Sequence, residues 1–230
     1  MENTFSKKIE VVELSMGISS KIEHTLLEPE TTSKDVRRIC DEAIAHGFFG
    51  VCIPPPFVGH AKKILESSKQ KIITVVGFPF GYNVTSSKVE ETKRAIDDGA
   101  DEIDMVMNIA AFRDRNFHYV LNDVQSVTTI SQLLNKKVKL IIESGILSEA
   151  DIQRACDIAK ETGVDFVKTS TGYSAGGATV EAVKLIRSIL PKKIKIKAAG
   201  GIRHRIFAEE LIEAGADRLG CSKSLQVIEE

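Results

Sequence analysis

The stretch TGVDFVKTS at residues 162–170 is one of four copies of a pattern that decides the fold. In each copy a glycine follows a helical segment, and a short apolar strand begins a few residues later. The other three copies are HGFFGVCI at 46–53, DGADEIDMV at 98–106 and AGADRLGCS at 214–222. A helix that ends at glycine and leads into a strand, repeated along the chain, indicates an alternating βα architecture.

A second kind of strand falls between these copies, with basic residues leading into an apolar run that ends in glycine. Its three examples are KIITVVGFP at 71–79, KVKLIIESG at 137–145 and KIKIKAAGG at 193–201. The run IEHTLL at 22–27 brings the expected strands to eight. The intervening segments are amphipathic, and those at 87–99 and 148–163 begin with serine and end with glycine, as capped helices do.

Strict alternation of strands and helices predicts a parallel sheet. Eight βα units in 230 residues predict the α/β class and a (βα)8 TIM barrel, somewhat shorter than is typical. We expect residues 1–230 to form a single domain in which residues 1–20 add an N-terminal helix. A doubly wound open sheet is the alternative, although no G-x-G-x-x-G motif follows the first expected strand.

The charge composition limits the partners. Lysine and arginine number 31 against 32 aspartates and glutamates, so the net charge of −1 gives no general attraction to nucleic acid or an anionic membrane. No run reaches the roughly 18 apolar residues of a membrane span, and the N-terminus has no signal-peptide core, so we expect a cytoplasmic protein. The four cysteines lack metal-ligand spacing and are predicted to be buried thiols.

Strand parity places charged side chains inside the expected barrel. Strand residues alternate between the interior and the helix layer, and the side that faces the helices must be apolar. In KIKIKAA the isoleucines face the helices, so Lys195 and Lys197 point inward, with Lys197 nearer the C-terminal mouth where active sites of this fold lie. The same argument turns Lys168 and Asp104 inward and brings Glu143 to the mouth.

Two inward lysines beside an aspartate indicate amine chemistry. A lysine attacks carbonyls as a neutral amine, and half deprotonation at pH 7 requires a fall of ~3.4 pKa units, about 4.6 kcal/mol. Burial and a second ammonium group can together supply that change. Parity does not choose between Lys168 and Lys197. It also leaves open a structural Lys–Asp–Lys cluster, a non-catalytic binding barrel, or acid–base catalysis by Asp104 and Glu143 in a barrel lyase or isomerase that acts on sugar phosphates.

Glycines at the ends of the last two strands predict a phosphate site. Gly200 and Gly201 follow the seventh expected strand, while Gly220 and Ser222 follow the eighth and lead into a short helical segment. TIM barrels often bind phosphate with these two loops and a helix N-terminus, because backbone N–H groups meet the anion there. The sequence therefore predicts a local anion site in a chain without a general positive charge.

Taken together, these residues give the chain a resemblance that covers nearly its whole length. It resembles the deoxyribose-phosphate aldolases, a family of class I aldolases in nucleoside catabolism. The motifs that carry the resemblance are EHTLLEPETT (23–32), VCIPPPFV (51–58), VVGFPFG (75–81), GADEIDMVMNI (99–109), IIESGIL (141–147), DFVKTSTGYSAGGAT (165–179), IKAAGGIR (196–203) and GADRLGCS (215–222).

The resemblance implies a role for each candidate residue. Lys168 forms a Schiff base, Lys197 is the neighbouring cation that favours its neutral amine, and Asp104 relays protons. Thr171 contacts substrate hydroxyls. The implied phosphate contacts are Gly172, Gly200, Gly201, Gly220 and Ser222. The implied reaction is the reversible cleavage of 2-deoxyribose 5-phosphate to glyceraldehyde 3-phosphate and acetaldehyde, with no metal and no organic cofactor. The implied partners are small sugar phosphates and aldehydes, with a homo-dimer or tetramer as the expected assembly.

The chain departs from the family pattern at several positions. Glu23 stands where the family usually has aspartate, so its part in the proton network is left open. Glu28, Tyr173 and Lys223 also differ from common family residues, and the resemblance therefore says less about phosphate affinity than about the Schiff base. Cys52 matches a cysteine beside the active site of relatives, and we expect it to be a packing thiol.

Overall fold

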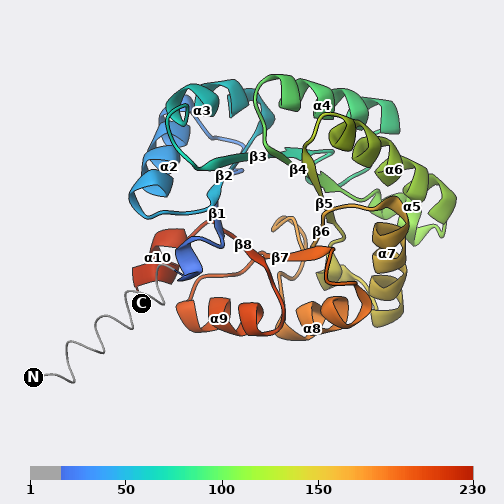
Figure 1. Ribbon diagram of the computed structural model, residues 1–230. Helices are drawn as coiled ribbons and strands as arrows, with labels where there is room; N and C mark the ends of the chain where they lie inside the picture. Colours follow the sequence, from blue (N-terminus) through green and yellow to red (C-terminus); the bar gives the residue numbers. More distant parts are fainter. Residues whose placement is uncertain (1–16, 230) are drawn as a thin grey trace, which may run out of the picture.

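The computed structural model describes residues 17–229, which contain a closed barrel of eight parallel strands. The strands are β1 Ile22–Thr25, β2 Gly50–Ile53, β3 Lys71–Val76, β4 Glu102–Val106, β5 Lys137–Ile141, β6 Phe166–Lys168, β7 Lys195–Ala199 and β8 Arg218–Cys221. Each strand pairs with its neighbours in sequence, and β8 returns to β1 to close the ring (Figure 1). All eight expected strands are present within the predicted runs.

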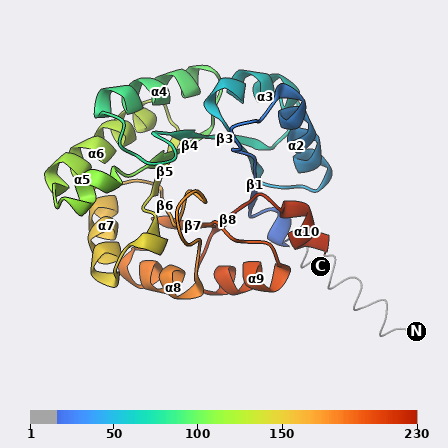
Figure 2. The same ribbon diagram turned by 180° about the vertical axis from the view of Figure 1, so that it is seen from behind.

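Helices follow every strand and form a layer outside the ring (Figures 1 and 2). They are α2 Ser33–Ala45, α3 Val58–Ile64, α4 Thr85–Asp97, α5 Ile109–Arg113, α6 Phe117–Leu133, α7 Glu149–Thr162, α8 Val180–Ile189, α9 Arg205–Glu213 and α10 Ser224–Glu229, with 3₁₀ turns at Pro55–Phe57 and Ser144–Ile146. This arrangement is a (βα)8 TIM barrel, as predicted. Closure of the ring excludes the doubly wound open sheet.

Local sequence explains where the helices begin and end. Ser148 precedes α7, its hydroxyl accepts the N–H of Asp151 at 3.2 Å, and Gly163 ends the helix with a left-handed φ of 69°. Thr32 and Asp35 form a reciprocal capping box at the start of α2. These contacts satisfy backbone groups that a helix leaves unpaired, and each N-cap typically contributes ~1 kcal/mol.

The barrel interior is charged on one side and apolar on the other. On β2 and β3 the inward residues Cys52, Ile73 and Val75 form a small apolar cluster of their own. Charged side chains line the interior along β4 to β8 and β1. The large hydrophobic core lies between the strands and the helices, where residues such as Ile103 and Ile196 are fully buried. The helix-facing parity expected for the isoleucines of β7 is therefore confirmed.

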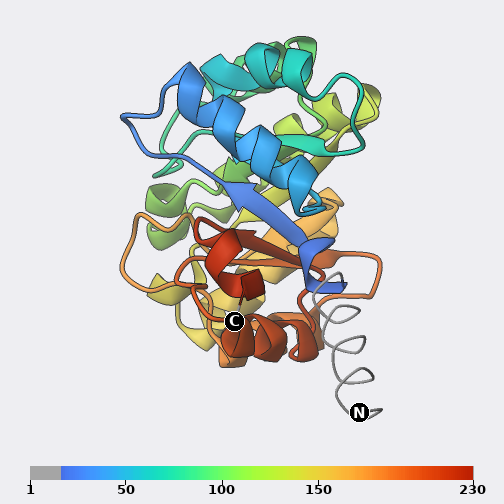
Figure 3. The ribbon, with the colours of Figure 1, turned by 90° about the vertical axis from the view of Figure 1, so that its left-hand side faces the viewer.

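Closure of the ring brings the two ends of the described chain together (Figure 3). Glu23 on β1 lies opposite Gly220 on β8, and His24 lies opposite Cys221. His24 Nδ1 is 2.8 Å from the Ser224 hydroxyl of α10, and its Nε2 is 2.7 Å from the Glu42 carboxylate of α2. Burial lowers the pKa of His24 in spite of Glu42. One buried side chain thus joins the first strand to the last helix.

Several expectations concern the chain as a whole. The helix expected over residues 1–20 lies mostly outside the described residues, of which 17–19 are helical. Cys40, Cys52, Cys156 and Cys221 are buried free thiols, as predicted. Within residues 17–229, no helix has the length and apolar character needed to cross a bilayer.

Candidate active site

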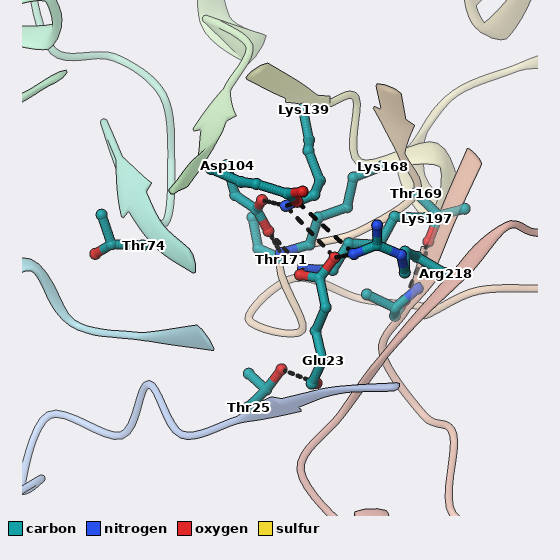
Figure 4. A network of polar contacts seen from close by, with 12 residues as sticks. Glu23, Thr25, Thr74, Asp104, Lys139, Lys168, Thr169, Thr171, Lys197 and Arg218 are labelled. Atoms are coloured by element: carbon teal, nitrogen blue, oxygen red, sulfur yellow. Dashed lines mark hydrogen bonds and ion pairs between the residues drawn. The ribbon is translucent and has the colours of Figure 1, made fainter. Parts of the chain in front are cut away.

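Seven charged side chains meet in one half of the barrel interior, and all of them except Glu102 are labelled in Figure 4. All of them come from inward strand positions and are almost completely shielded from solvent. They are the carboxylates of Glu23, Glu102 and Asp104 and the cations of Lys139, Lys168, Lys197 and Arg218. Burial of so much charge has a large desolvation cost, which is offset only where every group has partners of opposite sign.

Asp104 lies at the centre of this cluster. Its Oδ1 accepts a hydrogen bond from Lys139 Nζ at 2.8 Å, and its Oδ2 accepts from Lys168 Nζ at 2.8 Å and Lys197 Nζ at 2.7 Å. Burial alone would raise the pKa of Asp104, but the three ammonium groups outweigh it and hold that pKa well below its ordinary value. The three residues predicted to form the catalytic group are therefore in direct contact.

Glu23 reaches the same cluster from β1. Lys197 Nζ donates a hydrogen bond to its Oε2, and Arg218 Nη1 lies 3.3 Å from its Oε1. Burial by itself lowers the pKa of Lys197, but the carboxylates of Asp104 and Glu23 raise it well above the usual lysine value. Lys197 is thus held as a cation, and the glutamate that departs from the family pattern is one of the two carboxylates that hold it.

Lys139 and Arg218 belong to the cluster although the sequence analysis did not single them out. Lys139 Nζ lies 2.7 Å from Glu102 Oε2 as well as binding Asp104. The guanidinium carbon of Arg218 lies 3.0 Å from the centre of the Phe49 ring, a cation–π contact inside the barrel. The parity that turns Lys197 inward would also have found Lys139, because it is the third residue of the strand KVKLI.

The geometry distinguishes between the two candidate lysines. Lys139 and Lys197 are fully buried beneath the mouth, whereas the side chain of Lys168 retains 3% exposure and lines an open cleft. The cluster holds three carboxylates and four cations, so the charges balance when one of the four is neutral. Of the four cations, Lys168 is the one that lines this cleft.

A cleft of about 490 Å³ opens above Lys168 at the mouth of the barrel. Its wall is formed by the loops that follow β1, β6, β7 and β8. All residues expected to contact substrate or phosphate line it: Thr171, Gly172, Gly200, Gly201, Gly220 and Ser222. Three further cations, Arg38, Arg203 and Lys223, share the wall with a single carboxylate, Glu28. The cleft therefore suits an anion in a chain of net charge −1.

Two of the glycines in this wall are required by close packing. Gly200 has a φ of 89°, and a Cβ at this position would approach Gly177 Cα to 3.1 Å. At Gly220 a Cβ would lie 3.0 Å from the Cε of Lys197. The absence of a side chain at Gly220 thus leaves room for the lysine stem as well as for a ligand above it.

Glu143 lies at the mouth, as parity suggested, but its partner is Thr171. It follows β5 with a left-handed φ of 56°, and its carboxylate accepts the Thr171 N–H at 3.2 Å and the Thr171 hydroxyl at 2.5 Å. A buried non-glycine residue in this backbone region is a mark of a constrained site. Glu143 therefore orients the threonine that was expected to contact substrate hydroxyls.

Tyr173 extends across the mouth from the loop after β6. Its hydroxyl donates to the Leu27 carbonyl at 2.8 Å, and its ring meets Phe78 edge-on at a centroid distance of 5.4 Å. Burial and the charge of Glu28 raise the pKa of Tyr173, so the hydroxyl remains a donor.

Cys52 is fully buried in the apolar cluster, where desolvation raises the pKa of its thiol. Within residues 17–229, no group of three His, Cys, Asp or Glu side chains is arranged to hold a metal ion.

Comparison with known proteins gives consistent matches. A model of the DeoC/LacD family of aldolases matches residues 20–222, a segment that includes every residue of the charged cluster. The deoxyribose-phosphate aldolase of Thermococcus kodakarensis is 47% identical over 214 residues, which cover 92% of this chain and 96% of that protein. The deoxyribose-phosphate aldolase of Finegoldia magna is 45% identical over 214 residues, covering 93% of this chain and all of that protein.

Solved structures give the same result. The tetrameric deoxyribose phosphate aldolase from Aeropyrum pernix superposes with a TM-score of 0.88 at 30% identity, covering 94% of this chain and 91% of that chain. The similarity therefore extends over almost the whole of both chains.

Proposed function

Because the chain belongs to the DeoC/LacD family of aldolases, we propose that it cleaves 2-deoxyribose 5-phosphate reversibly to glyceraldehyde 3-phosphate and acetaldehyde through a Schiff base. One observation carries the residue assignment. Lys168 is the lysine of the buried cluster that lines the open cleft, and its amine is bound to the same carboxylate oxygen as Lys197. A nucleophile, a neighbouring cation and an anion site thus share one cavity.

The reaction begins at the amine of Lys168. In its neutral form the amine attacks the C1 aldehyde of the open-chain sugar, and loss of water leaves a protonated imine that draws electrons from the C2–C3 bond as the C3 hydroxyl loses its proton. Lys197 opposes a second positive charge beside it, because two ammonium groups on one carboxylate oxygen repel each other. Asp104, which stays ionised, holds both nitrogens in place.

Cleavage of the C2–C3 bond releases glyceraldehyde 3-phosphate and leaves the enamine of acetaldehyde on Lys168. Protonation of the enamine carbon and hydrolysis of the resulting imine release acetaldehyde and restore the amine. We assign the proton movements to Asp104 and Lys197 acting with water. Glu23 contributes by holding Lys197 as a cation from the opposite side.

The phosphate binds at the other end of the cleft. We expect backbone N–H groups of the glycine loops after β6, β7 and β8 to bind the anion, because these loops line the cleft together with Arg38, Arg203 and Lys223. Binding energy from this remote group positions C1 against Lys168, so it serves the chemical step as well as affinity. Lys223, at a position where the chain departs from the family pattern, adds a cation to this wall.

The acid–base alternative is less well supported by the contacts. It requires Asp104 and Glu143 to exchange protons with a substrate. Asp104 is neutralised by three lysines and its pKa is held low, while Glu143 is engaged with Thr171. Neither carboxylate is presented to the cleft as a free acid.

The direct test is an assay of 2-deoxyribose 5-phosphate cleavage with detection of acetaldehyde, followed by borohydride reduction in the presence of acetaldehyde. We expect turnover and a stable adduct of the enzyme, since only an imine is reduced to a permanent bond on lysine. Turnover without any adduct would support the acid–base alternative. Absence of turnover would refute the proposed substrate.

Ser222 provides a test of the phosphate site. Ser222→Asp puts a carboxylate beside the expected dianion, and two like charges 4 Å apart repel by roughly 4 kcal/mol at an effective dielectric constant of 20. Since Ser222 is exposed and partly screened, we expect KM for 2-deoxyribose 5-phosphate to rise by about 10- to 100-fold. Cleavage of unphosphorylated deoxyribose should hardly change. Ser222→Ala is the neutral control, and equal losses on both substrates would disprove the phosphate assignment.

We also propose a homo-oligomer as the working form. The support is the tetrameric relative from Aeropyrum pernix, which shares the barrel over most of both chains. Sedimentation equilibrium of the purified chain would give its mass in solution, and a monomer at micromolar concentration would contradict this part of the proposal.

A further inference from the structure

Tyr173 divides the barrel mouth into two compartments. Its side chain leaves the loop after β6, binds the Leu27 carbonyl after β1 and packs on Phe78 after β3. On one side lies the polar cleft with Lys168 and the glycine loops. On the other side lies a second cavity of about 500 Å³, and Leu27 and Tyr173 line both.

The second cavity is an apolar groove. We use that name for the space bounded by Leu27, Val75, Phe78, Tyr173 and the prolines that follow β1, β2 and β3. Its charged member, Glu91, already accepts the backbone N–H of Gly77 at 2.7 Å. The groove therefore offers hydrocarbon surface where the cleft offers cations and backbone amides.

The apolar groove continues downward into the barrel. Leu27 and Phe78 pack on the interior cluster of Cys52, Ile73 and Val75. Val75 lies opposite Asp104 in the register of β3 and β4, so this cluster is level with the carboxylate that binds Lys168. The apolar surface of the groove is thus continuous with packed side chains that lie beside the charged cluster, and Leu27 and Tyr173 form the wall between the groove and the cleft.

In the synthetic direction of the proposed reaction, the two ends of the product would lie in different compartments. The phosphate of glyceraldehyde 3-phosphate belongs to the polar cleft, and its chain runs from there to the new C–C bond. The donor aldehyde is held by Lys168, and its C2 carries only hydrogens when the donor is acetaldehyde. In a longer donor C2 carries an alkyl group, which would desolvate the cations of the polar cleft and is favoured on an apolar surface.

We propose that the apolar groove is a subsite for the C2 alkyl substituent of aldehyde donors longer than acetaldehyde, with Tyr173 limiting the length admitted. This inference rests on the proposed function. The donor R–CH2–CHO condenses with the Lys168 amine with loss of water and then loses a C2 proton to give an enamine. Its C2 attacks the carbonyl carbon of glyceraldehyde 3-phosphate, that oxygen gains a proton, and water releases the 2-alkyl product and the amine. No oxidant or reductant is required.

The experiment measures kcat/KM in the synthetic direction for acetaldehyde, propanal and hexanal, with glyceraldehyde 3-phosphate as acceptor. Each methylene newly buried in the groove gives roughly a fourfold gain. We therefore expect Tyr173→Ala to raise the ratio of hexanal to acetaldehyde by about tenfold or more. Tyr173→Phe keeps the ring and loses only the hydrogen bond to Leu27, so its increase should be smaller. Tyr82→Ala is the matched control, because Tyr82 is an exposed tyrosine outside both compartments.

A second variant tests whether the gain arises in the groove. Pro56 is an exposed residue of the groove wall, and Pro56→Glu adds a charge there without touching the cleft. Combined with Tyr173→Ala, it should remove most of the hexanal gain and leave acetaldehyde turnover similar. A gain that persists in the double variant would overturn the proposal.

Three other results would also overturn it. The first is an unchanged ratio of kcat/KM for hexanal to that for acetaldehyde in both Tyr173 variants, and the second is an equal loss of kcat/KM for all donors. The third is a fall in oligomer mass by light scattering in Pro56→Glu, which would mean that another copy of the chain covers the groove. Tyr173→Phe decides the matter if the alanine variant does not fold. Cleavage of 2-deoxyribose 5-phosphate by the unmodified enzyme, measured first, separates failure of this inference from failure of the proposed function.

Discussion

Replacing Lys168 by alanine is expected to abolish both turnover and adduct formation. The change removes the amine that lines the cleft, and loss of a covalent nucleophile typically reduces kcat by 10⁴-fold or more. The barrel should still fold, because Asp104 keeps its hydrogen bonds from Lys139 and Lys197. Steady-state cleavage of 2-deoxyribose 5-phosphate and mass spectrometry after borohydride reduction with acetaldehyde measure the two effects.

A matched control is available on the neighbouring strand. Lys195 begins β7 and is exposed at the end of the barrel opposite the mouth, so Lys195→Ala should retain activity and adduct. Peptide mapping of the wild-type adduct completes the test. If the label lies on a lysine other than Lys168, the assignment of the nucleophile is incorrect.

The second large effect is expected for Lys197→Leu. With Lys168 neutral, the three carboxylates of the cluster balance three cations, and removal of one cation favours a proton on Lys168. We expect activity at pH 7 to fall by roughly 10²- to 10³-fold, with the acidic limb of the pH–rate profile moved to higher pH. Part of the lost activity should return in alkaline buffer, where the amine is again neutral.

Lys139→Leu is the comparison for this prediction. Lys139 binds the other oxygen of Asp104, so its loss should move the acidic limb less than the loss of Lys197, which shares an oxygen with Lys168. Circular dichroism of both variants checks that the barrel is intact. A uniform loss across the pH range in Lys197→Leu, with an unmoved limb, would show that the lysine acts by holding Asp104 in place instead.

The fold was predictable because the chain repeats one local pattern. A glycine stop precedes four of the strands and basic residues lead into three others, so each strand could be found independently of the rest. The ends of the helices were predicted less accurately. The helix expected to start at Ser87 begins at Thr85, and it has no side-chain cap because its N-cap residue is Val84. The Thr85 hydroxyl instead donates to Asp123 of α6 at 2.9 Å, a contact between helices that no local pattern reports.

The site was predictable to the extent that strand parity controls it. Alternation gave the inward direction of Asp104, Lys168 and Lys197 correctly, and it would have given Lys139. Alternation did not predict which inward side chains bind one another, and it did not distinguish Lys168 from Lys197 as the nucleophile. That choice depends on which amine is near the mouth, a property of strand length and loop packing. The hydrogen bond from the Tyr173 hydroxyl to the Leu27 carbonyl also depends on loop packing. Because the two residues are 146 positions apart, the sequence did not predict it.

The pairing of β1 with β8 has a consequence for the chain during its synthesis. Glu23 is among the first described residues to be made, but Lys197 and Arg218, which neutralise it, are made nearly last. While the ribosome adds the intervening strands, the unfinished interior remains charged and hydrated, which opposes collapse around the wrong neighbours. We expect Glu23 to gain these partners only when the final strand pairs with β1 and closes the ring. A nascent chain with an open ring would then lack the complete cluster on which the proposed reactivity of Lys168 depends.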